Sequence, residues 1–275
     1  MNFTGIQSGS AREHRVGAHY DRLADGASLT RDTKFMNVGY WRDQPATLDE
    51  AARSLVRLVA SVAQLGPSDR ALDVGCGFGD QDILWVEEYG AGRIDAVNIS
   101  AYQLQVAERR IAARDLAERI HLRMASGTSL PFDAGTFDKV LCVEAAHHFD
   151  TREEFFREAY RVLRPGGVLV AADILLQPGR RLGRLSHRVM HIPRANGYAK
   201  DGCDRKLRAI GFTDVELRSI SEEVFPPFAR FLAQRFASRA AFVGASTLVR
   251  RGIEALLTRR FGALDFVITS ARKKA

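Results

Sequence analysis

The sequence predicts an α/β protein in which helices cover both faces of one mostly parallel β-sheet. From residue 70 onward, short apolar runs alternate with longer segments whose apolar residues recur at helical spacing. The first run leads directly into a loop with three glycines. The length of 275 residues suits one such domain with additions, and no internal repeats occur. The expected strands are residues 70–74, 93–99, 120–124, 137–143, 168–173, 212–220 and 264–270, and the expected helices among the first five strands are residues 81–89, 101–116 and 152–163.

Composition restricts the class of protein. Hydrophobic residues make up 46% of the chain, which is typical of a globular protein with a proper core. No run of about 18 apolar residues occurs, so we expect no membrane span, and the first residues lack the apolar core of a signal peptide. The three cysteines, Cys76, Cys142 and Cys203, are odd in number and far apart, which fits neither a disulfide framework nor a zinc site. We expect a cytoplasmic protein.

The net charge of +7 is unevenly distributed. Residues 180–275 contain 20 Lys and Arg against 8 Asp and Glu, whereas residues 1–179 contain 20 against 25. A basic C-terminal third could meet nucleic acid, an anionic lipid surface or an acidic substrate. The arginines come singly or in pairs, however, without the clustered aromatic residues of a base-stacking surface. We therefore expect no nucleic-acid partner.

The glycine loop follows the first strand in the stretch ALDVGCGFGD, residues 71–80. Glycine is needed where the backbone takes a positive φ or must lie directly against a ligand. The loop also leaves unpaired amides at the start of a helix, where a carboxylate or a hydroxyl can bind. Its glycines, Gly75, Gly77 and Gly79, stand at alternate positions, whereas the third glycine of a dinucleotide-binding loop comes one residue later. Together with Asp73 inside the strand, this pattern indicates a ligand site more than an ordinary turn.

This stretch resembles motif I of the class I S-adenosylmethionine (SAM) methyltransferases. The resemblance implies a Rossmann-like sheet of seven strands, with SAM bound across the tip of the first strand. Gly75 and Gly77 would let the backbone approach the methionine part and the ribose, and Asp73 would orient the amino group. The cofactor contacts that the resemblance implies are Asp73, Gly75, Cys76, Gly77, Gly79, Asn98, Ile99, Ser126, Gly127, Glu144 and Tyr20.

Two of these segments depart from the commonest pattern of the family. The second strand ends in Asn98, where an acidic residue usually holds the ribose hydroxyls. An amide both donates and accepts hydrogen bonds, so Asn98 could still hold a hydroxyl. The segment ASGTSLPF after the third strand resembles the family's GDAxxLPF, with Ser126 at the acidic position that pairs with the adenine amino group. Ser126 can still bond a base edge, and a plain turn is the alternative.

The fourth strand ends in Glu144, and His147 and His148 follow shortly after it. Adjacent histidines point in different directions and are a poor metal pair by themselves, so we expect no metal. Strand ends in an open parallel sheet line the ligand crevice. We therefore expect His147 at the reaction centre and Asp173, at the tip of the next strand, as the carboxylate that orients it. The alternative is two unrelated polar residues at one sheet edge.

The distance of 26 residues between His147 and Asp173 resembles that of natural-product sugar O-methyltransferases. The resemblance is closest to the macrolide sugar enzymes of the erythromycin type, and it covers roughly residues 36–174 and the last strand. It implies that His147 is the general base, with Asp173 as its partner, in methyl transfer to a hydroxyl of a polyketide, macrolide or sugar. SAM would be the cofactor and S-adenosylhomocysteine the product.

Residues 1–66 are expected to form an N-terminal helical lid. Residues 48–65 have helical spacing and stop at Gly66 and Pro67. This helix would place the aromatic segment before it over the glycine loop. The segments HYD and NVGYW, followed by TLDEAA, resemble the lids of SAM methyltransferases acting on sugars, sterols and lipids. The resemblance makes Tyr20 a cofactor contact and Tyr40 a substrate contact.

The methyltransferase domain is expected to span residues 67–275, with cap insertions at about 175–205 and 225–261. The first insertion is rich in arginine and the second in phenylalanine. These insertions would form an apolar acceptor pocket with a basic rim, suited to an amphiphilic acceptor, and we name His148 and Arg180 as substrate contacts. A solvated face and a satellite core are the alternative. We expect the last strand to enter antiparallel between the fifth and sixth, followed by a solvated tail at residues 272–274.

Several alternatives remain open at this point. A nicotinamide-dependent oxidoreductase is disfavoured by the glycine spacing and by the later LPF and RPGG segments. A SAM-binding protein without catalysis is disfavoured by His147 and Asp173. Among methyltransferases, a C- or N-methyltransferase acting on a lipid, quinone or other secondary metabolite is the alternative to O-methylation. Some relatives use Mg²⁺ to polarise the hydroxyl, and the sequence shows no clear carboxylate cluster for it. The partner is a small-molecule acceptor, and a homo-oligomer is possible.

Overall fold

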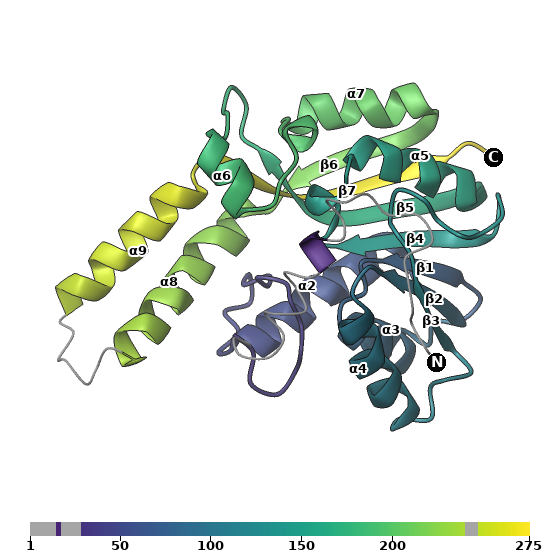
Figure 1. Cartoon of the computed structure of the whole chain (residues 1–275), viewed down its shortest axis with the longest axis horizontal. Coiled ribbons are helices and arrows are strands. Elements are labelled where there is room, and N and C mark those ends of the chain that lie inside the picture. Colours follow the sequence, from purple (N-terminus) through teal and green to yellow (C-terminus); the bar gives the residue numbers. More distant parts are fainter. Residues whose placement is uncertain (1–14, 18–28, 240–246) are drawn as a thin grey trace.

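The computed structural model describes residues 15–17, 29–239 and 247–275 of the chain. The expected helical stretch around residues 19–21, with Tyr20, lies outside the described residues. Within the described parts, no helix is both long enough and apolar enough to cross a lipid bilayer. Figure 1 shows a central twisted sheet with helices on both faces and a pair of long helices that extends away from it.

The sheet has seven strands in the order β3-β2-β1-β4-β5-β7-β6. Its strands β1 to β5 run parallel, and β7 runs antiparallel to both of its neighbours. The predicted α/β fold, the seven strands and the antiparallel insertion of the last strand between the fifth and sixth are confirmed. The strands are β1 (Arg70–Val74), β2 (Arg93–Asn98), β3 (Ile120–Met124), β4 (Phe137–Val143), β5 (Leu163–Leu176), β6 (Phe212–Ser219) and β7 (Leu264–Lys273).

Helices pack on both faces of the sheet and bury two apolar cores (Figure 1). One core lies under α2, α3 and α4, and the other lies under α5 and α7. Successive side chains of a strand alternate between the faces, so Ala71 joins the first core and Leu72 the second. These helices are α2 (Leu48–Ala63), α3 (Asp80–Tyr89), α4 (Ala101–Ala112), α5 (Arg152–Val162) and α7 (Lys200–Ile210).

Some element boundaries differ from those predicted. Helix α2 stops two residues early because Gln64 takes a left-handed conformation, with φ of 51°. Strand β5 is longer than predicted at both ends. It begins at Leu163, which pairs with Phe137 of β4, and it continues to Leu176, which pairs with Leu264 of β7. The predicted solvated tail is wrong for Lys273. It belongs to β7, and its ammonium donates to the Tyr160 carbonyl at 2.7 Å.

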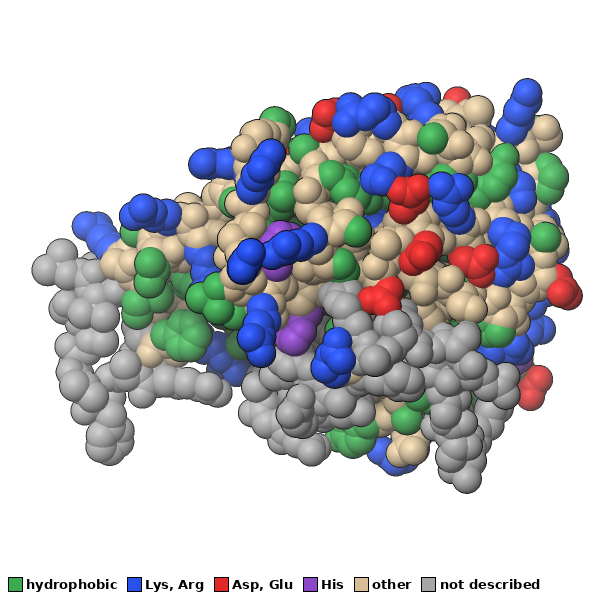
Figure 2. All heavy atoms as spheres, turned by 45° about the horizontal axis from the view of Figure 1, so that its top comes forward, with side chains coloured by type: hydrophobic (Ala, Val, Ile, Leu, Met, Phe, Trp, Pro, Cys, Tyr) green, Lys and Arg blue, Asp and Glu red, His purple; other side chains and the backbone are tan. Residues whose placement is uncertain are grey.

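A short 3₁₀ helix, η1 (Ala146–His148), follows β4, and the two segments expected as cap insertions contain further helices. The first holds α6 (Arg184–Val189) and the short 3₁₀ helix η2 (Arg194–Asn196). The second forms α8 (Ser221–Arg239) and α9 (Thr247–Phe261), which pack against each other beside the sheet (Figure 1). On the face shown in Figure 2, Lys and Arg side chains are spread over the surface together with Asp and Glu.

Candidate active site

The glycine loop joins β1 to α3 and is fixed across two strands. The amides of Gly75 and Cys76 both donate to the Val97 carbonyl, at 2.8 and 3.1 Å. Gly75 has φ of +92°, and a Cβ atom there would lie 2.5 Å from the Cβ of Ala145. Gly77 has φ of +57°, and a Cβ atom there would meet only the Met36 side chain, at 3.9 Å. Gly75 is therefore required by close packing, whereas Gly77 leaves the backbone open toward the space in front of the loop.

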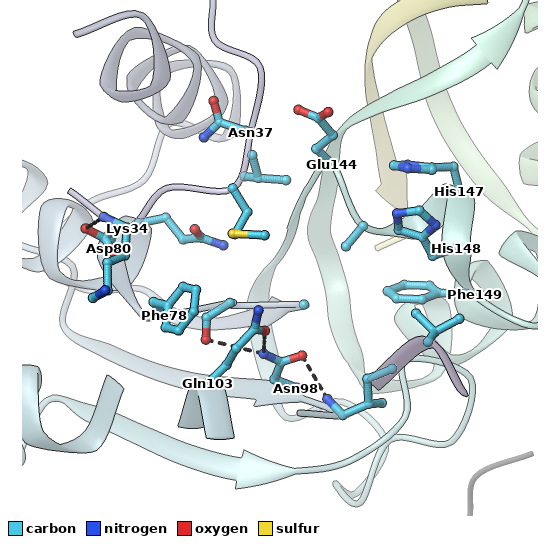
Figure 3. Close-up of a pocket in the computed structure, with 18 residues that line it drawn as sticks. Lys34, Asn37, Phe78, Asp80, Asn98, Gln103, Glu144, His147, His148 and Phe149 are labelled. Carbon is cyan, nitrogen blue, oxygen red and sulfur yellow. Dashed lines mark hydrogen bonds between the residues drawn. The ribbon is translucent and has the colours of Figure 1, made fainter. Parts of the chain in front are cut away.

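A pocket of about 930 Å³, its open mouth included, lies in front of this loop at the carboxyl edge of the sheet. Figure 3 shows His147, His148 and Phe149 along one side of it and Lys34, Phe78 and Asp80 along the other. The predicted site residues that line it are Gly75, Gly77, Asn98, Ile99, Glu144, His147 and His148. The predicted residues that the structure places behind or away from its wall are Asp73, Cys76, Gly79, Ser126, Gly127, Asp173, Tyr40 and Arg180.

Asp73 is fully buried and reaches the pocket only through another side chain. Its Oδ2 accepts a hydrogen bond of 2.9 Å from Nε2 of Gln81, and Gln81 lines the pocket. Burial raises the pKa of Asp73 to about 7. Burial and the charge of Asp73 also raise the pKa of Asp82, which is buried beside it. Two buried carboxyl groups cannot both ionise readily, so this pair retains a proton near neutral pH.

Asn98 ties the glycine loop to the start of α4. Its amide nitrogen donates to Oε1 of Gln103 at 2.7 Å and to the Gly77 carbonyl at 3.3 Å, and its Oδ1 accepts from the Ile99 amide. Gln103 lines the pocket and was not among the predicted residues. The backbone amide of Gln103 donates to the hydroxyl of Ser100, which caps the start of α4 as the sequence predicts. Gln103 therefore orients Asn98 at the position where the ribose is expected.

Four of the predicted residues outside the wall have packing positions instead. A Cβ on Gly79 would lie 3.2 Å from Ala107, so Gly79 lets α3 and α4 approach closely. A Cβ on Gly127 would lie 2.7 Å from the ring of Phe149, which does line the pocket. Ser126 is fully buried, and its hydroxyl lies 2.8 Å from that of Thr128. Cys76 is buried in the core under the loop.

The two predicted substrate contacts of the lid and cap also lie away from the pocket wall. Tyr40 is 7% exposed and belongs to the core that contains α2. It follows a segment in which Met36 and Asn37 do line the pocket. Arg180 is exposed in the first cap insertion. The aromatic segment therefore reaches the pocket through residues next to the predicted Tyr40.

The segment before α2, which we call the lid segment (residues 31–38), is held by three carboxylates, those of Asp49, Asp80 and Glu144. Asp49, in the first turn of α2, accepts hydrogen bonds from the amides of residues 31–33 and from the Thr33 hydroxyl. Burial would raise the pKa of Asp49, but these hydrogen bonds outweigh it and lower the pKa. Asp80 accepts from the Lys34 amide at 3.1 Å and pairs with Arg110. Lys34, Met36 and Asn37 were missed by sequence analysis because only these distant contacts bring them to the pocket.

Glu144 lies at the end of β4 with φ of +52° and lines the pocket. Its Oε2 accepts a hydrogen bond of 2.9 Å from the Val38 amide, so it also holds the lid segment. Burial raises the pKa of Glu144 to about 8. A carboxyl group in this position attracts a cationic ligand, whose charge favours the ionised form.

His147 and Asp173 meet beside the pocket, as the sequence predicts. Nδ1 of His147 lies 2.6 Å from Oδ1 of Asp173, and both side chains are 6% exposed. Because Asp173 is acidic, Nδ1 carries the proton in this bond, and Nε2 is left as the ring nitrogen that can accept one. Burial would raise the pKa of Asp173, but the charges of Arg152 and His147 outweigh it and lower the pKa to about 2.

His148 packs directly against His147. The ring centroids lie 3.9 Å apart, and Nδ1 of His148 lies 3.4 Å from the His191 carbonyl in the first cap insertion. Burial and the neighbouring His147 lower the pKa of His148 well below its usual value. His148 is therefore neutral near pH 7.

The residues present fit SAM, whose cationic amino acid part requires acidic or carbonyl partners. Gly77 leaves open backbone toward the pocket, and Glu144 supplies a carboxyl group in its wall. Among the described residues, no group of three or more His, Cys, Asp or Glu side chains is arranged to hold a metal ion.

A seven-stranded sheet with this order, a glycine loop after β1 and a pocket at the carboxyl edge define a class I SAM-dependent methyltransferase fold. Comparisons with known proteins agree with this fold class.

Residues 72–171 match the model of a family described as "Methyltransferase domain". The chain is 34% identical to erythromycin 3''-O-methyltransferase of Saccharopolyspora erythraea, over 94% of this chain and 90% of that protein. It is also 34% identical to 27-O-demethylrifamycin SV methyltransferase of Amycolatopsis mediterranei, over 60% of each chain. The chain belongs to the class I SAM-dependent methyltransferases, and its cofactor is SAM.

Solved structures share this fold. The [4+2]-cyclase SpnF superposes with a TM-score of 0.76 and 23% identity, over 99% of this chain and 100% of that one. Geranyl diphosphate C-methyltransferase of Streptomyces coelicolor superposes with a TM-score of 0.74 and 17% identity, over 98% of this chain and 100% of that one. At these identities the likeness concerns the fold alone. Because the chain belongs to the methyltransferases, the alternative of a nicotinamide-dependent oxidoreductase is excluded.

Proposed function

We propose that this enzyme transfers a methyl group from SAM to a hydroxyl of a small-molecule natural product, with His147 as general base. The acceptor is a polyketide, a macrolide or a sugar attached to one. The observation that carries the proposal is the 2.6 Å contact between Nδ1 of His147 and Oδ1 of Asp173 beside the pocket. This contact leaves the second ring nitrogen of His147 as the proton acceptor.

SAM supplies an electrophilic methyl group, so the protein must hold the acceptor hydroxyl in line and remove its proton. Gly75, Gly77, Gln81, Asn98 and Glu144 are the residues that would hold the cofactor. Positioning contributes on the order of 7–11 kcal/mol to such a reaction, and a general base contributes typically about 10²–10⁴ in rate. Nε2 of His147 takes the hydroxyl proton, and Asp173 stabilises the imidazolium that forms.

The acceptor class is supported by the relatives and by the wall of the pocket. The two relatives named above act, by their names, on erythromycin and rifamycin compounds. The apolar side chains of Met36, Phe78 and Phe149 line the pocket beside the polar groups. A pocket with both kinds of side chain suits an amphiphilic acceptor.

The direct test is turnover of SAM in the presence of hydroxylated polyketides and macrolide glycosides, with S-adenosylhomocysteine and the methylated product measured by mass spectrometry. His147→Ala should lose about 10²–10⁴ in kcat, while its affinity for SAM is retained. His121→Ala, on β3 and outside the pocket, serves as the control. If His147→Ala keeps full activity, His147 is not the base, and C- or N-methylation of a lipid or quinone becomes the better proposal.

A further inference from the structure

Two buried polar side chains, Arg152 and Asn196, surround the His147–Asp173 pair. Arg152 is the first residue of α5, and Asn196 is the last residue of η2 in the first cap insertion. Their exposed fractions are 1% and 2%. Neither of them lines the pocket. A buried guanidinium is costly unless its donors are paired, so its partners indicate what it holds in place.

Arg152 holds the oxygen of Asp173 that His147 does not use. Its Nε donates to Oδ2 of Asp173 at 2.8 Å, and one terminal nitrogen donates to the Ile174 carbonyl at 2.7 Å. The planar guanidinium thus binds two adjacent residues near the end of β5, and this fixes the rotamer of the Asp173 carboxylate. A lysine at this position could supply the charge but not the planar fork.

Asn196 holds the loop that carries His147. Its amide nitrogen donates to the carbonyls of His147 and Phe149, at 3.2 and 2.9 Å. Its Oδ1 accepts a hydrogen bond of 2.8 Å from the Arg152 amide, and its own carbonyl accepts one of 3.2 Å from the Arg152 guanidinium. Asn196 and Arg152 are therefore hydrogen-bonded to each other. Asn196 also binds the backbone of His147, and Arg152 binds the side chain of Asp173.

We propose that Arg152 and Asn196 are positioning residues for methyl transfer, which act by holding His147 and Asp173 in one mutual orientation. This inference rests on the proposed role of His147 as the base. Arg152 keeps Asp173 an anion with Oδ1 directed at His147, and this selects the ring tautomer with the proton on Nδ1. Asn196 extends the same support into the cap, so the base and the first cap insertion are held as one unit.

The test compares Arg152→Met, Arg152→Lys and Asn196→Ala with a control on the same helix, Arg157→Met. Arg157 is exposed and pairs with Glu153 one turn away. For each variant, kcat and the KM for SAM are measured from pH 5.5 to 9, and the ring tautomer of His147 is read by ¹⁵N NMR. The His147 signals are assigned by their loss in His147→Ala.

We expect Arg152→Met and Asn196→Ala to lower kcat by about tenfold to a hundredfold, which is less than the 10²–10⁴ that a general base supplies, with the KM for SAM little changed. In Arg152→Met, the loss of activity on acidification should begin at a higher pH than in the wild type. The ¹⁵N signals of His147 should show a mixture of tautomers. Arg152→Lys should recover part of the loss, because it restores the charge. Arg157→Met should resemble the wild type.

The inference is overturned if Arg152→Lys and Asn196→Ala fold and keep the wild-type kcat, pH profile and tautomer while His147→Ala is inactive. If His147→Ala itself keeps full activity, the proposed function fails first, and the two failures are thereby distinguished. Should Arg152→Met not fold, the Lys and Ala variants decide the outcome. A lower melting temperature with unchanged kcat in all folded variants would show a purely structural role.

Discussion

Oδ1 of Asp173 accepts two hydrogen bonds from the same residue, one from Nδ1 of His147 at 2.6 Å and one from the His147 backbone amide at 3.2 Å. The carboxylate thus fixes both the ring of His147 and the backbone that carries it. This arrangement is more restrictive than a side-chain contact alone, because rotation of the ring cannot occur without loss of the first bond, and movement of the loop breaks the second.

The stability of the protein should depend on the ionisation of Asp173. Its pKa in the folded state, about 2, lies below the usual 3.8, so its contribution is present above about pH 4 and is lost as the pH falls through 2. The loss amounts to about 2 kcal/mol. Asp173→Asn should lack this dependence and, near pH 5, be less stable by roughly 3–5 kcal/mol, because Arg152 is left buried and unpaired. Urea unfolding of both proteins between pH 2.5 and 5 measures the difference, and parallel curves would contradict the prediction.

Glu144 should produce the opposite dependence at higher pH. Its pKa is raised from 4.5 to about 8 in the folded state without cofactor, so the folded state favours the protonated form. This contribution is full below about pH 4.5 and is lost as the pH rises toward 8. Thermal unfolding of the cofactor-free enzyme should therefore show a falling melting temperature across this range. Glu144→Gln, which mimics the protonated side chain, should show a shallower fall, whereas the exposed Glu50→Gln should follow the wild type.

Binding of SAM should release protons near pH 7 if Glu144 lies in the cofactor subsite. The cationic cofactor favours the ionised carboxylate, so a side chain that is largely protonated beforehand loses its proton. Calorimetric titration with SAM in phosphate and in Tris, buffers of different ionisation enthalpy, gives the number of protons released. Glu144→Gln should release fewer, and equal release from both proteins would place Glu144 outside the subsite.

The glycines of the loop should differ in their response to alanine. Gly75→Ala introduces left-handed strain of about 1–2 kcal/mol and a contact of 2.5 Å with the Cβ of Ala145, so both stability and SAM binding should fall. Gly77→Ala adds strain but little contact, so it should mainly weaken SAM binding. Gly135→Ala is the matched control, since Gly135 also has a positive φ but nothing lies within 4 Å of its added Cβ. Unfolding measurements and SAM titration of the three variants test these differences in stability and in SAM affinity.

Asp49 should control the lid segment from a distance. Replacement by alanine leaves three backbone amides of residues 31–33 without their acceptor, at a cost of roughly 1–3 kcal/mol for each buried one. The segment with Met36 and Asn37 should then loosen, so the KM for SAM should rise and hydrogen exchange at residues 31–38 should accelerate. Glu50→Ala, at the next position of the same helix, is the control. Unchanged exchange in Asp49→Ala would show that the other lid contacts suffice.

The fold could be predicted from the sequence because its information is local. The apolar runs end within a few residues of the observed strands, and Ser100 begins the helix that it was expected to cap. The His147–Asp173 contact was also predictable, since His147 follows the end of β4 and Asp173 lies near the carboxyl end of β5, its parallel neighbour. A position at a strand end is a strong restriction on where a side chain can lie.

The rest of the site depends on contacts between distant segments. Gln81 is recognisable as a pocket residue only once Asp73 is known to turn away from the pocket. Arg152 looks like an ordinary charged residue at a helix start, and its burial depends on Asn196, 44 residues later. Tyr40 was chosen for its type, but packing against α2 places it in the core, away from the pocket wall. Periodicity and motif spacing carry no information on such pairings.

Strand β7 places Val267 directly opposite Asp173, between two strands made earlier in synthesis. A nascent chain that has emerged as far as residue 261 contains every other strand, yet β5 has no neighbour on that side and β6 has no place in the sheet. The Asp173 end of β5 therefore gains its neighbour on that side only after residues 264–273 have left the ribosome. Catalytic competence should arise in one late step of biosynthesis rather than gradually as the polypeptide lengthens.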